Sequence, residues 1–163
     1  MLNFTTGRQL LEITQDLDIS IAEVMQRREE KISGRSREDI RRQMARSLEI
    51  MDEGGRTARE TVTRSLGGLI GGESKRFSDH IQEHSTLSGP FLEVALAAAM
   101  SVMEVNATMG LIVAAPTAGS AGIIPGIMAA AKEVLELSDD ARIDGLFTAG
   151  AIGWLATYNG SIS

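Results

Sequence analysis

The sequence contains no cysteine among its 163 residues. A chain without cysteine forms no disulfide and offers no thiolate as a nucleophile or metal ligand. Proline and aromatic residues are also scarce, with three prolines and an aromatic share of 4%. Ala, Leu, Ile and Met therefore supply most of the apolar surface. Together with 17 glycines, this composition favours helices that pack closely through small residues.

Basic residues are fewer than acidic ones, which gives a formal net charge of -6 at pH 7. An acidic chain is a poor candidate for binding nucleic acid. The first residues, Met1–Gly7, lack the basic start and apolar core of a signal peptide, so we expect a cytoplasmic protein. The length predicts one domain, residues 1–163, with a core of its own.

Charge is unevenly distributed along this domain. Most of the charged side chains precede residue 86, and few follow it. We therefore interpret residues 1–85 as a charged helical shell and residues 86–163 as apolar helices that carry the site. The sequence stops shortly after an apolar helical pattern, at Asn159–Ser163, and we expect it to be part of a longer polypeptide.

Helix signals recur along the chain, and no segment alternates with a period of two residues. Thr6, Ser20 and Ser36 are candidate N-caps, Gly34 is a candidate C-terminal stop, and Gly54–Gly55 can bend or end the third helix. Further helical patterns cover residues 57–66, 90–106, 123–137 and 138–158. The pattern predicts an all-α protein: a compact multi-helix domain with a buried loop rich in Gly and Pro.

That loop belongs to an uncharged stretch, Val105–Gly126. Its backbone polar groups must be paired if it is buried, and a substrate is one candidate partner. Within it, residues 116–122 lead into a helix, where amides of Gly119 and Gly122 and hydroxyls of Thr117 and Ser120 can hold a carboxylate or phosphate. The alternative is a turn between helices that needs glycine only for close packing.

Two further polar residues are candidates for the same site. Lys75 can supply a cation for a substrate carboxylate, although a solvated lysine is the simpler interpretation. Asn106 lies at the end of an apolar helical pattern, so it is either a helix cap or a site residue. Glu104, with Asn106 and Gly110, argues against a membrane span over residues 94–115.

One metal-binding pattern is present. His80, Glu83 and His84 match H-x-x-E-H, the inverted signature of zinc peptidases. On a helix both imidazoles would share a face, with Glu83 as the base. Helix signals around Phe77 are weak, however, and the alternative is a polar surface linker. A zinc peptidase would need a third ligand, and a non-catalytic helical interaction module would lack a polar concave site.

Four segments together resemble the alpha subunit, or catalytic domain, of iron–sulfur-dependent L-serine dehydratase. They are Gly67–Lys75, Met103–Gly110, Ile112–Gly126 and Phe147–Ser163. Their order and spacing also fit that family, and the resemblance covers nearly the whole chain.

The resemblance implies that the intact enzyme is an L-serine ammonia-lyase, which converts L-serine to pyruvate and ammonia. It implies a [4Fe–4S] cluster as cofactor, with one open iron acting on the substrate hydroxyl. It also implies a beta subunit or regulatory domain as partner and an oligomeric enzyme, with no nucleic acid and no membrane involved. Asn106, Thr117, Gly119, Ser120, Gly122 and Lys75 are then the candidate residues for binding L-serine.

Two departures from the family concern the cluster. The family's cysteine ligands mostly lie downstream of the segment at which this sequence stops. Position 121 is Cys in many relatives, where it is a candidate ligand, but it is Ala121 here. A chain without cysteine cannot hold the cluster by thiolate ligation. We therefore expect no metal or cofactor in this chain, and no activity from it alone.

Overall fold

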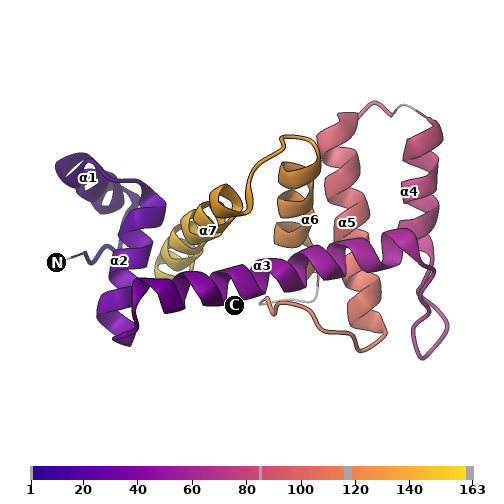
Figure 1. Ribbon diagram of the computed structural model, residues 1–163, viewed down its shortest axis with the longest axis horizontal. Coiled ribbons are helices and arrows are strands. Elements are labelled where there is room, and N and C mark those ends of the chain that lie inside the picture. The colour runs from indigo at the N-terminus through magenta and orange to yellow at the C-terminus, as the bar shows by residue number, and fades with distance from the viewer. Residues whose placement is uncertain (1, 85, 116–118, 161–163) are drawn as a thin grey trace. The chain divides into compact units, whose positions relative to one another are not determined.

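Residues 2–84, 86–115 and 119–160 are described by a computed structural model. Over these residues the structure has seven α-helices and no strand (Figure 1). The helices are α1 (Gly7–Leu17), α2 (Ile21–Ser33), α3 (Arg37–Glu60), α4 (Glu73–Glu83), α5 (Gly89–Ala107), α6 (Ser120–Glu133) and α7 (Asp139–Asn159). The all-α prediction is confirmed.

The chain forms two compact units. The first contains residues up to 45 together with those from 139 onward, and the second contains residues 46–138. This division differs from the change in charge density at residue 85, because α7 packs on α2 in the first unit. Helices associate where they bury apolar faces against each other, and the density of charged residues along the sequence does not show which faces these are.

The first unit is built around α1, α2 and α7. Its core is formed by Phe4, Leu10, Val24 and Ala151. The indole Nε1 of Trp154 donates a hydrogen bond to the Phe4 carbonyl at 3.1 Å, which joins α7 to the N-terminal segment.

Three predicted helix ends of this unit are confirmed. The Thr6 hydroxyl accepts from the Gln9 amide, and the Ser20 hydroxyl accepts from the Glu23 amide. Gly34 ends α2 in the left-handed conformation, with φ of 70°. These local signals act within one turn of chain, which is why sequence alone identified them.

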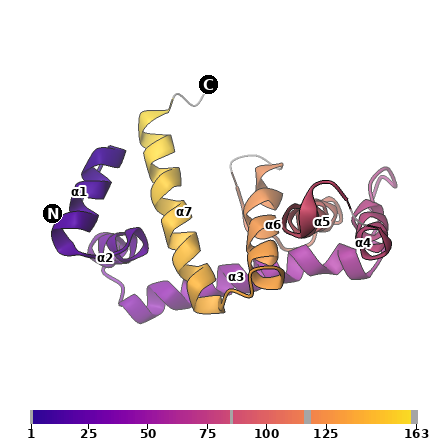
Figure 2. The same cartoon turned by 90° about the horizontal axis from the view of Figure 1, so that it is seen from above.

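The second unit depends on very close packing of α5 against α6, which lie side by side in Figures 1 and 2. A Cβ atom at Gly126 would lie 2.4 Å from the Ala95 carbonyl oxygen, and one at Gly122 would lie 2.8 Å from that of Ala99. Only glycine allows the two backbones to approach so closely. Small residues therefore determine the spacing of the helices that border the site.

Gly54–Gly55 does not end the third helix, since α3 continues to Glu60. Ser101 of α5 is hydrogen-bonded to this part of α3. Its hydroxyl donates to the Gly54 carbonyl at 2.6 Å and accepts from the Ala58 amide at 2.8 Å. A partner helix thus supports backbone groups that a pair of glycines would otherwise leave weakly held.

Three predicted boundaries are wrong. The helical pattern over 57–66 stops at Glu60, where the β-branched residues 61–63 follow. The segment around Phe77, where helix signals are weak, is helix α4. α6 begins at Ser120 and ends at Glu133, so Pro125 lies inside the helix and beyond its first turn. Packing of Gly122 on α5 stabilises the earlier start.

Burial of the Gly/Pro-rich loop is confirmed only at its C-terminal end. Ala121 and Gly122 are buried, but both already belong to α6, whereas Gly119 is exposed. Residues 116–118 lie outside the described part of the chain. Just before them, Leu111 is 67% exposed, so an uncharged sequence did not imply a buried backbone there.

α5 is the one helix, within the described residues, whose length and composition would suffice to cross a membrane. A core helix of a soluble protein passes the same test. Glu104 of α5 is buried and hydrogen-bonded to other parts of the second unit, which is how a core helix accommodates a charged residue.

Candidate functional site

A pocket of about 450 Å³ lies in the second unit. The segment before α4, the beginning of α4, one face of α5 and the beginning of α6 contribute to it. Its lining residues are Ile70, Glu73, Leu96, Ala99, Met100, Met103, Glu104, Gly119 and Gly122. Most of these are apolar, so the two carboxyl groups are the conspicuous polar features. Such a pocket is the usual setting for a small-molecule site.

Glu104 is almost fully buried, with 2% of its surface exposed. One carboxyl oxygen accepts from the Ser74 amide at 2.6 Å. The other accepts from the Gly72 amide at 2.9 Å and from the Thr63 hydroxyl at 3.2 Å. A carboxylate at the N-terminus of α4 satisfies amides that have no partner within the helix and interacts favourably with the helix dipole.

These hydrogen bonds hold a backbone that only glycine can adopt. Gly71 and Gly72 have φ of 143° and 90°, and a Cβ at Gly71 would lie 2.0 Å from the Thr63 carbonyl oxygen. Glu104 therefore anchors a tight turn from a neighbouring helix. This turn determines where Glu73, the first residue of α4, reaches the pocket.

Glu73 is the second carboxyl group at the pocket. Its Oε2 accepts from the Gly71 amide at 2.7 Å. Hydrogen bonds from its own amide and from Gly71 lower the pKa of the Glu73 carboxyl, and the Arg76 charge adds to this effect. Glu73 is thus ionised at neutral pH and places a carboxylate, which also forms a 3.4 Å ion pair with Arg76, at the edge of the pocket.

The N-terminus of α6 also borders the pocket. Gly119 is at the N-cap position and supplies no side-chain cap, and Ser120 and Ala121 follow as the first helical residues. A helix start carries a partial positive charge and is suited to bind an anion. Gly119 and Gly122 both line the pocket, while Gly122 also provides the close contact with α5. Close packing is thus observed at Gly122, and binding of an anion by the same loop stays a prediction.

The other predicted site residues are distributed as follows. Thr117 lies outside the described residues. Asn106 is half-buried in the last turn of α5, where its carbonyl accepts from the Met109 amide at 3.0 Å. Lys75 is on α4, and its ammonium contacts both carboxyl oxygens of Asp79 at 2.5 and 2.7 Å. The charge of Lys75 is therefore already balanced on its own helix. Of the predicted site residues, Gly119 and Gly122 line the pocket, whereas Ser120, Asn106 and Lys75 are not among its lining residues.

The histidines of the H-x-x-E-H pattern lie near the end of α4. Their rings stack with centroids 4.5 Å apart, both side chains are exposed, and His84 caps the helix. Within residues 2–84, 86–115 and 119–160, no three His, Cys, Asp or Glu side chains are grouped to hold a metal ion. The third ligand that a zinc peptidase needs is not among them.

Sequence reasoning used Glu104 only as an argument against a membrane span and did not identify it as a site residue. The available signal was a single acidic residue inside an otherwise apolar helical pattern. A buried charge is expensive unless it is paired or hydrogen-bonded, so such a residue predicts nearby donors. The pattern did not show which donors these would be.

Comparisons with known proteins agree with this arrangement of motifs. A family model described as serine dehydratase alpha chain matches residues 16–163. The chain is 41% identical over 160 residues to a probable L-serine dehydratase alpha chain of Bacillus subtilis, covering 98% of this chain and 53% of the relative. It is 34% identical over 160 residues to the L-serine dehydratase alpha chain of Peptoniphilus asaccharolyticus, covering 96% and 53%.

A similar match is found with the L-serine dehydratase of Mycobacterium tuberculosis, at 33% identity over 174 residues, covering 99% of this chain and 36% of the relative. The chain spans about half the length of the two alpha chains that it matches. The extent of the family match, together with these identities, shows that this chain belongs to the serine dehydratase alpha chain family.

Proposed function

We propose that the intact enzyme containing this chain converts L-serine to pyruvate and ammonia. The similarity to relatives named L-serine dehydratase supports the reaction. The single structural observation that carries the assignment is the pocket between α4, α5 and α6, which has a helix N-terminus at one edge and the Glu73 carboxylate at another.

This pair of groups complements the two charges of an amino acid. The amides at Gly119 and Ser120, with the Ser120 hydroxyl, would bind the serine carboxylate at the positive end of α6. The Glu73 carboxylate would bind the ammonium group. Thr117 and Asn106 would complete or orient the loop, and Lys75 would act only through its pairing with Asp79. The apolar lining would exclude water from the reacting carbons.

The proposed cofactor of the intact enzyme is a [4Fe–4S] cluster, but this chain does not fit the role of its scaffold. There is no cysteine in the sequence, and Ala121 is a buried small residue. Thiolates are the usual ligands of such clusters. We therefore derive no catalytic step through a cluster on this chain. The ligands would come from residues beyond this sequence, and the chain alone would be inactive.

The partners proposed for this chain are the remainder of its own enzyme, a beta subunit or regulatory domain, and further copies in an oligomer. Two of the relatives are named alpha chains, which supports an enzyme built from more than one kind of chain. We further propose a cytoplasmic location with no membrane partner, and the acidic net charge supports the absence of nucleic acid as a partner.

The decisive experiment measures pyruvate release from L-serine by the complete, anaerobically prepared enzyme. Ser120→Ala removes one donor to a charged group, which costs about 1.5–3 kcal/mol, so kcat/KM should fall roughly ten- to a hundredfold. Glu73→Gln should raise KM for L-serine. Glu83→Gln, which removes an exposed carboxylate at the far end of α4, is the matched control and should change neither constant.

If Glu73→Gln and Ser120→Ala both leave kcat/KM unchanged, the pocket is not the serine site. If the complete enzyme releases no pyruvate from L-serine, the proposed reaction is wrong. The same assay on the present chain should give no pyruvate, and no iron or sulfide should remain bound after reconstitution.

A further inference from the structure

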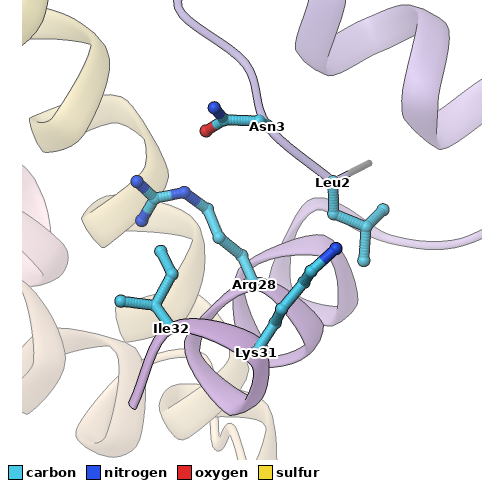
Figure 3. Close-up of a pocket in the computed structure, with 5 residues that line it drawn as sticks. All are labelled: Leu2, Asn3, Arg28, Lys31 and Ile32. Carbon is cyan, nitrogen blue, oxygen red and sulfur yellow. The ribbon is translucent and has the colours of Figure 1, made fainter. Parts of the chain in front are cut away.

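A second pocket, of about 260 Å³, lies in the first unit and shares no residue with the pocket between α4, α5 and α6. Leu2 and Asn3 of the N-terminal segment line it, together with Arg28, Lys31 and Ile32 of α2 (Figure 3). Two cationic side chains and one amide thus share a small concavity with two aliphatic side chains.

Arg28 is held in place by aromatic contacts. Its guanidinium carbon lies 4.3 Å from the centroid of the Trp154 ring and 6.0 Å from that of Phe4. Cation–π stacking orients the planar guanidinium without neutralising its charge. Figure 3 shows the guanidinium extending from α2 between Asn3 and Ile32. The group is therefore pre-organised, which reduces the entropy lost when it binds an anion.

Neither cation of this pocket has a carboxylate partner among the residues that the structure describes. Within the described ranges, no carboxylate forms an ion pair with Arg28 or Lys31, and the Arg28 Nε is buried with no hydrogen-bond partner. Nearby arginines behave differently, since Arg37 pairs with Glu23 and Glu30. A buried donor without an acceptor is costly. Because this Nε is enclosed by protein, an external acceptor would meet the outer guanidinium nitrogens, and the unpaired charge of Arg28 at the pocket favours an anion there.

We propose that this pocket binds a small organic carboxylate with a short apolar tail. The planar guanidinium matches the two oxygens of a carboxylate, and Lys31 adds a second positive charge. Leu2 and Ile32 offer apolar surface to a tail of a few carbons. The volume is below that of pockets for drug-sized ligands, which limits the ligand to a few carbon atoms. The site is separate from the proposed serine pocket and does not depend on it.

Trp154 provides the test, because it is the one tryptophan of the chain and stacks on Arg28. Butyrate is titrated into the 163-residue chain, and tryptophan fluorescence and isothermal calorimetry are recorded. Butyramide, which has the same shape without charge, and inorganic phosphate are titrated in parallel. We expect saturable binding of butyrate with a dissociation constant on the order of 1 mM, as a few charge-assisted hydrogen bonds would provide, and no binding of butyramide.

Variants identify the residues involved. Arg28→Met retains much of the stem on Trp154 but loses the charge, and should weaken butyrate binding roughly ten- to a hundredfold. Lys31→Met should weaken it about threefold or more. Arg27→Met is the matched control: it removes the same charge from the next position of α2, where Arg27 pairs with Glu23 and does not line the pocket. Its affinity should stay within about twofold.

Circular dichroism confirms that each variant retains its helices. Absence of saturable butyrate binding to the folded chain would overturn the proposal, as would binding that persists in Arg28→Met. Tighter binding of phosphate than of butyrate would overturn the carboxylate assignment. None of these results bears on pyruvate formation by the complete enzyme, so this proposal and the proposed function can fail separately.

Discussion

Replacing Glu104 by Gln is the sharpest test of how the pocket between α4, α5 and α6 is built. The substitution preserves the shape of the side chain and replaces one carboxyl oxygen by an amide nitrogen. In the native structure each carboxyl oxygen faces a backbone amide, that of Ser74 or that of Gly72. The Gln amide has one acceptor oxygen and one donor nitrogen. Whichever orientation it takes, its nitrogen faces an amide that also donates.

The magnitude follows from that mismatch. One charge-assisted hydrogen bond, worth about 1.5–3 kcal/mol, is lost, and one buried amide without a partner costs about 1–3 kcal/mol. Because the two estimates describe overlapping effects, we expect a loss of about 2–4 kcal/mol in the free energy that holds the turn before α4. Every 1.4 kcal/mol corresponds to a factor of ten, so local opening should become at least about thirtyfold more frequent.

Amide hydrogen exchange measures this opening residue by residue. In Glu104→Gln, the Gly72 and Ser74 amides should exchange at least about thirtyfold faster. Glu60→Gln is the matched control, since Glu60 is a 60% exposed side chain at the end of α3 and 3.6 Å from Arg56. It should shift exchange by less than about threefold. Trp154 belongs to the other unit, so its fluorescence is not the measure of this opening.

Unchanged protection of Gly72 and Ser74 in Glu104→Gln would refute the reasoning. It would mean that the turn is held by the glycine conformations and its own contacts, with Glu104 contributing nothing. Faster exchange throughout the second unit, and not at these amides in particular, would also contradict a local anchoring role.

Three further outcomes are expected. Gly126→Ala places a methyl group against the Ala95 carbonyl and should destabilise the second unit by about 1–3 kcal/mol in urea unfolding. Gly150→Ala, whose Cβ meets nothing within 4 Å, should instead stabilise the chain by about 0.5–1 kcal/mol. Equal effects of the two substitutions would contradict the packing argument. Glu73 should titrate by NMR below an ordinary glutamate, because its folded pKa is lowered. Its contribution to stability is then present above the unfolded pKa and lost as pH falls through the folded pKa, and a pKa at or above the ordinary value would contradict this. Ser120→Ala should alter the melting temperature of the complete enzyme by less than about 2 °C while kcat/KM falls, and a large loss of stability would indicate a structural role instead.

The sequence by itself determined the features that depend on neighbouring residues. Helix caps at Thr6 and Ser20 act through hydrogen bonds to residues three positions away, so their spacing is visible in the letters. The absence of cysteine excluded thiolate chemistry in this chain. The four motif segments between Gly67 and Ser163 identified the family, because the order and spacing of several short segments carry information that a single motif does not.

The tertiary structure decided what depends on contacts between distant residues. The continuation of α3 through Gly54 requires Ser101, 47 positions away, and the turn at Gly72 requires Glu104, 32 positions away. The early start of α6 requires close contact of Gly122 with Ala99. In each case the local sequence alone is compatible with a bend, a loop or a helix. The choice is made by a hydrogen bond or a steric contact whose partner no local pattern can name.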